Sequence, residues 1–203
     1  MATTDRERVA VFIDYQNCYG AAREAFHDPG NDPSQLGNVH PRALAELLAA
    51  KGGRQRDLVH AAAYTGLPDP TLDPKTHRAR SRQIVAWQAK GVHVVSRPLR
   101  YLPRWMNERP REKGIDVKLG IDAVMMALRG GYDVAVVASC DTDLAPVVEA
   151  LLELEATRGA PAVEVIAWKG RENRIGVSGK TLTERWIGPK DYAAVKDSTD
   201  YNI

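Results

Sequence analysis

The chain has 203 residues and a mass of 22.3 kDa, with 44% hydrophobic and 27% charged residues, which is typical of a globular protein able to bury a full core. No apolar stretch is long enough to span a bilayer, and no signal peptide is recognised. The two cysteines, Cys18 and Cys140, are too few for a disulfide framework and form no CxxC zinc motif. We therefore expect a cytoplasmic protein with no membrane partner.

The net charge of +2 is distributed unevenly. Residues 51–113 contain 14 Lys and Arg against 5 Asp and Glu, a net charge of +9, so the rest of the chain carries −7. A basic middle between acidic flanks is expected if one part of a protein attracts polyanions and another holds cations. The alternative is a solvated surface that happens to be uneven.

The N-terminal part of the chain predicts two strands and two helices. Residues 9–14, VAVFID, are β-branched and aromatic, which is typical of a buried parallel strand, and residues 15–26 follow with helical spacing. After a turn-rich loop, residues 41–51 are predicted as a helix with proline in its first turn. Residues 58–64 are the second predicted strand.

The middle of the chain is where the basic residues gather. Residues 75–90 are predicted as a helix with a basic N-terminal half, and residues 92–96 as the third strand. Residues 97–113 contain three prolines and no clean period, so we expect an irregular basic arm. A helix over residues 115–129 follows and ends at two glycines.

The C-terminal part completes an alternating pattern. Residues 132–139 and 163–168 are predicted as strands four and five, with a helix over residues 141–158 between them. Residues 188–203 look like a tail over the surface of a domain formed by residues 1–187. Strands that alternate with helices of this length predict an α/β fold with a mainly parallel sheet.

Aspartates follow two of these strands. Asp14 ends the first strand, Asp141 and Asp143 lie just past the fourth, and Asp116 lies near the start of the helix over residues 115–129. Ligands of parallel α/β sheets bind at the carboxyl ends of the strands, so Asp14, Asp141 and Asp143 would meet if the first and fourth strands are neighbours. Asp116 could point into the same cleft. Crowded carboxylates repel each other unless a divalent cation neutralises them, and oxygen ligands favour Mg²⁺ or Mn²⁺. Such a site is suited to phosphodiester hydrolysis.

A plainer reading of the same polar residues is helix capping. Asp141 has the position of an N-cap and Asp143 that of a first-turn acid. Asn17 and Ser139, at the same two strand ends, could hold waters or phosphate or could act only as local caps. The spacing alone leaves both interpretations open.

Five motifs together resemble the NYN domain, a branch of the PIN-like nuclease superfamily, over roughly residues 8–170. They are FIDYQN (12–17), GLPDP (66–70), RPLRY (97–101), EKGIDVKLGIDA (112–123) and SCDTDLAPVVEA (139–150). The resemblance implies a PIN-like three-layer α/β/α sandwich with a central, mainly parallel sheet. It also implies an acidic pocket that binds Mg²⁺ or Mn²⁺ for RNA cleavage.

The family's motif residues carry over to named positions of this chain. The first-strand acid, the KGxD acid and the two acids of S-x-D-x-D match Asp14, Asp116, Asp141 and Asp143, which are the expected catalytic and metal-binding residues. Asn17 and Ser139 match the family's asparagine and serine and are expected to contact substrate. Cys140 fills a place where small residues are usual, and we expect it to be buried rather than catalytic.

The function expected from these residues is metal-dependent hydrolysis of RNA in RNA processing or turnover. Arg97, Arg100 and Arg104 would contact phosphates, and Tyr101 would stack on unpaired bases. One alternative is a non-catalytic RNA- or protein-binding module on a PIN-like scaffold. Another is a glycosyltransferase with a DxD metal site, for which the short chain leaves little room for an acceptor. RNA is the expected partner, and a homodimer is left open.

Overall fold

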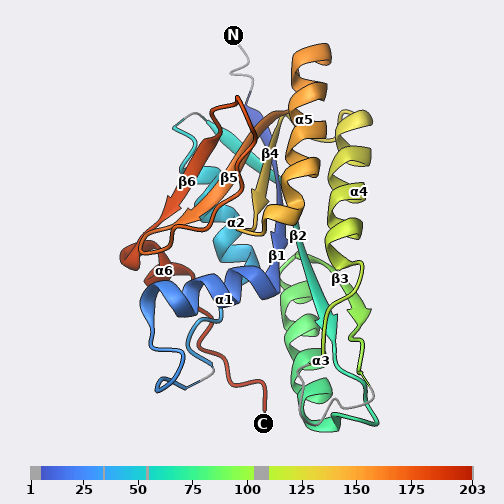
Figure 1. Cartoon of the computed structure of the whole chain (residues 1–203), viewed down its shortest axis with the longest axis vertical. Helices are drawn as coiled ribbons and strands as arrows, with labels where there is room; N and C mark the ends of the chain where they lie inside the picture. Colours follow the sequence, from blue (N-terminus) through green and yellow to red (C-terminus); the bar gives the residue numbers. More distant parts are fainter. Residues whose placement is uncertain (1–5, 34, 54, 103–109, 203) are drawn as a thin grey trace.

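The computed structural model describes residues 6–33, 35–53, 55–102 and 110–202. Its centre is a parallel sheet with the strand order β3-β2-β1-β4-β5-β6 (Figure 1). The strands are β1 (Glu7–Asp14), β2 (Arg56–Leu67), β3 (His93–Pro98), β4 (Val134–Ala138), β5 (Ala162–Trp168) and β6 (Thr183–Ile187). Within the described residues, no helix is long and apolar enough to cross a membrane.

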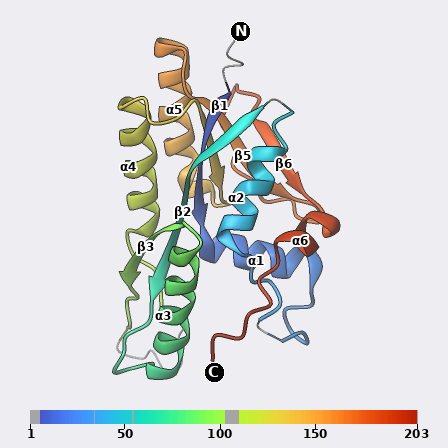
Figure 2. The same ribbon diagram turned by 180° about the vertical axis from the view of Figure 1, so that it is seen from behind.

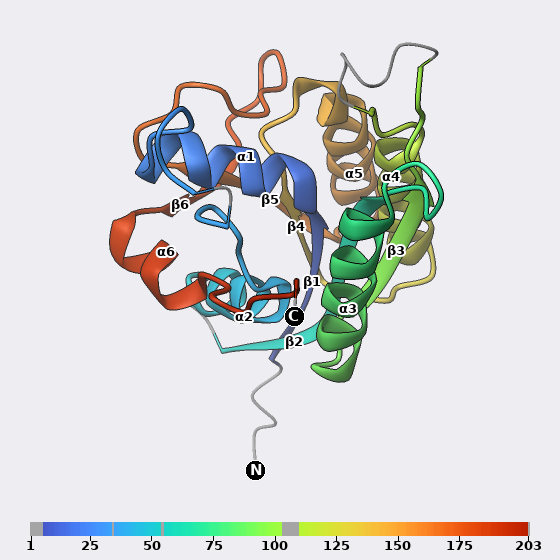
Figure 3. The ribbon, with the colours of Figure 1, turned by 90° about the horizontal axis from the view of Figure 1, so that it is seen from below.

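Helices cover both faces of this sheet. Figure 3 shows α4 and α5 on one side and α2 and α6 on the other, and Figure 2 shows the second side from the front. The predicted three-layer α/β/α sandwich is therefore confirmed, with a sheet that is parallel throughout. The helices are α1 (Tyr15–Phe26), α2 (Pro41–Ala50), α3 (Pro74–Ala89), α4 (Ile115–Leu128), α5 (Ala145–Arg158) and α6 (Pro189–Val195), with a short 3-10 turn η1 (Thr142–Leu144).

The two faces of β1 belong to two separate apolar cores. Val9, Val11 and Ile13 pack in the core under α1 and α2, whereas Ala10 and Phe12 pack in the core under α4 and α5. All five side chains are fully buried. Burial on both faces explains why this strand is a continuous apolar run rather than an alternating one.

The last strand and the last helix were not predicted from the sequence. The segment 188–203, expected as a surface tail, begins with α6, whose Tyr192 and Val195 are buried in the first core. Asp191 stabilises the start of this helix by accepting a hydrogen bond from the backbone N of Gly188 at 2.9 Å. A helix of seven residues is too short for its apolar period to be recognised in the sequence.

Candidate active site

The order of the strands brings the ends of β1 and β4 together. The two strands pair in parallel with Ile13 opposite Ala138, so that Asp14 and Ser139 follow at the same edge. Oγ of Ser139 donates to Oδ2 of Asp14 at 2.9 Å and accepts from the backbone N of Asp141 at 3.0 Å. The buried Ser139 therefore links two of the predicted site acids directly.

A second link crosses the same edge through Asn17. Oδ1 of Asp14 accepts from the backbone N of Asn17 at 3.1 Å, which caps α1, and Oδ1 of Asn17 accepts from the backbone N of Cys140 at 2.7 Å. Cys140 is buried as expected, and burial raises the pKa of its thiol to about 11. Asn17 and Ser139 thus connect the ends of β1 and β4, and these contacts between residues distant in the sequence fix the geometry of the acidic edge.

The DxD pair forms a cap as well. Oδ1 of Asp141 accepts from the backbone N of Asp143 at 2.9 Å. As a result, the helix predicted from Asp141 begins as the 3-10 turn η1, and α5 starts only at Ala145. Capping occupies one oxygen of Asp141, so it does not exclude a second role for this carboxylate or for Asp143.

Asp116 reaches the same edge from the first turn of α4. This helix begins after Gly114, whose φ of 70° lies in the left-handed region that glycine adopts without strain. Burial, and then repulsion from Asp141 and Asp143, raise the pKa of Asp116 above its ordinary value. Asp116 and Asp143 line the same pocket between α4 and α5.

Asp14 is the most perturbed of these acids. Its side chain is only 4% exposed, and burial raises its pKa to about 7 in spite of the hydrogen bonds from Asn17 and Ser139. The negative charges of Asp116 and Glu112 raise it further. A carboxyl group buried near other carboxylates favours its neutral form, which is the signature of a site that lacks positive charge.

Glu112 is a member of the cluster that the sequence reasoning missed. Its carboxylate accepts a hydrogen bond from the backbone N of Gly66. Burial raises the pKa of Glu112, the Gly66 contact lowers it, and Asp116 raises it again. A Cβ on Gly66 would lie 2.1 Å from Cδ2 of Leu99 and 2.9 Å from Oε1 of Glu112, so a larger residue here would displace these side chains. The sequence signal was the EKGID motif itself, from which only the aspartate was carried over.

The donor set fits a hard divalent cation. Its ligand atoms are carboxylate oxygens, and the raised pKa values of Asp14, Glu112 and Asp116 reflect burial together with mutual repulsion that a cation would relieve. Within the described residues, no three His, Cys, Asp or Glu side chains already converge on one ion position. Mg²⁺ commonly keeps several water ligands and only one or two carboxylates, so an ion does not require full convergence.

The described parts of the basic arm border the acidic edge. Arg97, exposed at the end of β3, extends toward the start of α4, since a Cβ on Gly114 would lie 3.8 Å from its Nη1. Arg100 is also exposed, and its backbone pairs with that of Arg111. The hydroxyl of Tyr101 accepts from the backbone N of Asp69 at 3.1 Å, which ties this ring to the neighbouring loop. Arg104 lies outside the described residues.

Comparison with known proteins agrees with the architecture. The profile of the NYN domain matches residues 8–167. A crystal structure of a protein of unknown function from Vibrio parahaemolyticus is similar, with a TM-score of 0.55 and 18% sequence identity over 93% of this chain and 96% of that chain. This likeness concerns the fold alone. No curated protein matches the chain.

Proposed function

Because the chain belongs to the NYN domain family of the PIN-like nuclease superfamily, we propose that it is a metal-dependent ribonuclease. The observation that carries the proposal is the buried Asp14, whose pKa is raised to about 7 among further carboxylates at the carboxyl ends of β1 and β4. The retention of a buried acid without a compensating cation is unfavourable for stability, and functional sites are where such groups concentrate.

Asp14, Asp116, Asp141 and Asp143 would hold Mg²⁺ or Mn²⁺. A cation bound there would lower the pKa of a water and polarise the scissile phosphate of RNA. The chain's own contribution is to fix the acids: Ser139 and Asn17 hold Asp14 in place, and the cap of η1 orients Asp141.

Positive charge for the substrate comes from the neighbouring arm. Arg97 is exposed beside the start of α4, and Arg100 is exposed at a pocket that it lines with Glu112. Both would contact RNA phosphates near the cleaved bond. A purely binding module would need these cations but would gain nothing from a buried, raised-pKa acid. This difference favours turnover over binding alone.

The test is cleavage of single-stranded and structured RNA with and without Mn²⁺. The variants Asp14→Asn and Asp141→Asn should lower the cleavage rate by at least about 100-fold, because each removes a charge that holds the cation. Asp57→Asn is the matched control, since Asp57 is 54% exposed in a surface pair with Arg6 and should leave the rate unchanged.

Two outcomes would contradict the proposal. Equal cleavage by wild type, Asp14→Asn and Asp141→Asn would show that the acids are not the catalytic centre. RNA binding by the wild type without cleavage, under Mg²⁺ and Mn²⁺ alike, would favour the non-catalytic RNA-binding module.

A further inference from the structure

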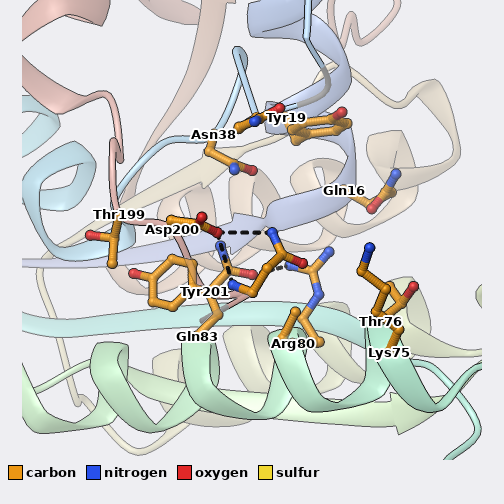
Figure 4. Close-up of a pocket in the computed structure, with 13 residues that line it drawn as sticks. Gln16, Tyr19, Asn38, Lys75, Thr76, Arg80, Gln83, Thr199, Asp200 and Tyr201 are labelled. Atoms are coloured by element: carbon orange, nitrogen blue, oxygen red, sulfur yellow. Dashed lines mark hydrogen bonds between the residues drawn. The ribbon is translucent and has the colours of Figure 1, made fainter.

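A polar pocket of about 570 Å³ lies between α1, α3 and the C-terminal segment 197–202 (Figure 4). We propose that it binds one nucleotide of a single-stranded RNA, with its phosphate on Lys75 and Arg80 and its base against neighbouring amide groups. The proposal rests on the proposed ribonuclease function and adds a substrate subsite to it. The volume is within the range of small-molecule pockets.

The cations of the pocket come from the first two turns of α3. Figure 4 shows Lys75 and Arg80 extending from α3 toward α1. Nη1 of Arg80 donates to Oε1 of Gln83 at 2.6 Å, and its guanidinium lies 5.1 Å from the centre of the Tyr15 ring. Gln83 is itself buried and donates to the hydroxyl of Tyr15 at 3.1 Å. Arg80 is therefore held in place before any anion binds.

The wall formed by α1 relates the pocket to the acidic edge. Gln16 lines the pocket and lies between Asp14 and Asn17 in the sequence, at the start of α1. A nucleotide held in the pocket would thus be close to the proposed site of cleavage, as expected for a nucleotide next to the cleaved bond in the same RNA.

The remaining wall groups suit a base better than a bare anion. Gln16 supplies an amide donor and acceptor, and Asn38 an amide donor, since its Oδ1 already accepts from the Tyr15 hydroxyl at 2.9 Å. Thr76 adds a hydroxyl and Tyr19 an aromatic ring at the same cavity. Amides hydrogen-bond to base edges, and aromatic rings are the usual stacking partners of unpaired bases. A simple phosphate would make use of Lys75 and Arg80 alone.

The C-terminal segment lies outside the residues matched by the NYN profile and forms the last wall. It is fixed to α3, because Nη1 of Arg82 donates to the backbone O of Tyr201 at 2.8 Å. The buried Asp197 accepts from the Tyr201 hydroxyl at 2.8 Å and from Nε1 of Trp87 at 3.4 Å. The subsite is thus completed by a part of the chain beyond the family domain.

This wall also brings a negative charge. Asp200 lines the pocket, and its Oδ1 accepts from the backbone N of Asn202 at 2.9 Å. Its carboxylate would repel a bound phosphate, whereas Lys75 would attract it. Removal of the Asp200 charge should therefore raise the affinity for a nucleotide, and removal of the Lys75 charge should lower it.

The experiment is an NMR titration of the protein, in the presence of EDTA, with the four nucleoside 5′-monophosphates and with inorganic phosphate. Lys75→Ala should raise the dissociation constant about tenfold, the loss of one charge-assisted hydrogen bond. Asp200→Asn should lower it about threefold by removing a repulsive charge. Lys90→Ala is the matched control at the other end of α3 and should leave it unchanged.

The pocket is not a nucleotide site if Lys75→Ala and Lys90→Ala bind alike, or if inorganic phosphate binds as tightly as the nucleotides. RNA cleavage without nucleotide binding would overturn the subsite and leave the ribonuclease intact. Nucleotide binding with the expected order of variants, but without cleavage under Mg²⁺ or Mn²⁺, would overturn the ribonuclease and support the subsite.

Discussion

Two carboxylates are buried in the sheet to nearly the same degree, and their surroundings are opposite. Glu164 on β5 is 3% exposed and accepts hydrogen bonds from Arg56 at 2.8 and 3.2 Å and from Arg185 at 2.6 Å. Burial alone would raise the pKa of Glu164, but the two arginines more than offset this and hold it below its ordinary value. Asp14 is 4% exposed, has only neutral hydrogen-bond donors, and has a pKa raised to about 7.

The difference follows from their places in the sheet. Glu164 lies within β5 opposite Val136, where Arg185 of the neighbouring β6 and Arg56 at the start of β2 supply fixed cations. Asp14 lies at the carboxyl end of β1, where ligands of parallel sheets bind. Arginines fixed by the fold stabilise the charge of Glu164, whereas the charge of Asp14 would be stabilised only by the divalent cation that we propose.

The largest effect on stability should come from removing the charge of Glu164. Glu164→Gln leaves the largely buried Arg56 and the partly exposed Arg185 beside a neutral group and should lower the free energy of unfolding by about 3–5 kcal/mol. Asp14→Asn should not lower it, because that change removes an unfavourable buried charge. Urea denaturation at pH 7.5 with a chelator measures both. Asp57→Asn, at an exposed pair, is the control and should stay within about 1 kcal/mol.

A loss of stability in Asp14→Asn comparable to that in Glu164→Gln would remove the distinction. It would mean that the charge of Asp14 is itself stabilising in the metal-free fold.

The pH dependence should separate the two groups in the metal-free protein. The folded pKa of Asp14 lies above its unfolded value of 3.8, so its contribution to stability is full below pH 3.8 and is lost as the pH rises through about 7. The total loss is on the order of 4 kcal/mol. The contribution of Glu164 runs the other way: its pKa is lowered, so stability is gained above the unfolded value of 4.5 and is lost as the pH falls.

The measurement is the difference in free energy of unfolding between wild type and Asp14→Asn at intervals from pH 4 to pH 8. The variant should become the more stable of the two as the pH rises through this window. A constant difference would show that Asp14 titrates in the folded protein as it does in the unfolded chain.

The next effect concerns the cation. Mn²⁺ at 100 times its dissociation constant should stabilise the wild type by about 2.7 kcal/mol, because it binds the folded state and not the unfolded chain. Asp141→Asn should lose most of this gain, whereas Glu164→Gln should keep it from a lower baseline. Thermal unfolding with and without Mn²⁺ tests this, and equal stabilisation of wild type and Asp141→Asn would place the cation elsewhere.

The sequence predicted those features of the acidic edge that depend on residues close together in the chain. The apolar run before Asp14 indicated a strand end, and the spacing of Asp141 and Asp143 indicated a cap or ligand pair. The contact between Asp14 and Ser139 depends on β1 pairing with β4, a non-local choice that no local pattern encodes. The prediction that the acids meet depended on this pairing, and β1 and β4 do pair in the structure.

The missed parts share the same cause. Glu112 lies in a segment whose basic charge dominates, and its partner Gly66 is 46 residues away in the sequence. The ion pairs of Glu164 join it to Arg56 and Arg185, which are 108 and 21 residues away in the sequence, so the residue gave no local sign of its role. β6 and α6 are short and follow a polar stretch, so no period of either kind was visible.

The smallest effect should come from the basic arm. Its arginines are exposed, so they cannot neutralise Asp14 as Arg56 and Arg185 neutralise Glu164. Arg97→Ala with Arg100→Ala should weaken RNA binding uniformly across sequences, because phosphate contacts carry no sequence information. The slope of log K against log salt should become shallower by about 2, one unit for each lost phosphate contact. Arg129→Ala with Arg158→Ala, at the far ends of α4 and α5, is the matched control. Identical slopes for the two double variants would mean that the basic arm does not touch RNA, and the charge of residues 97–102 would then be only a solvated surface.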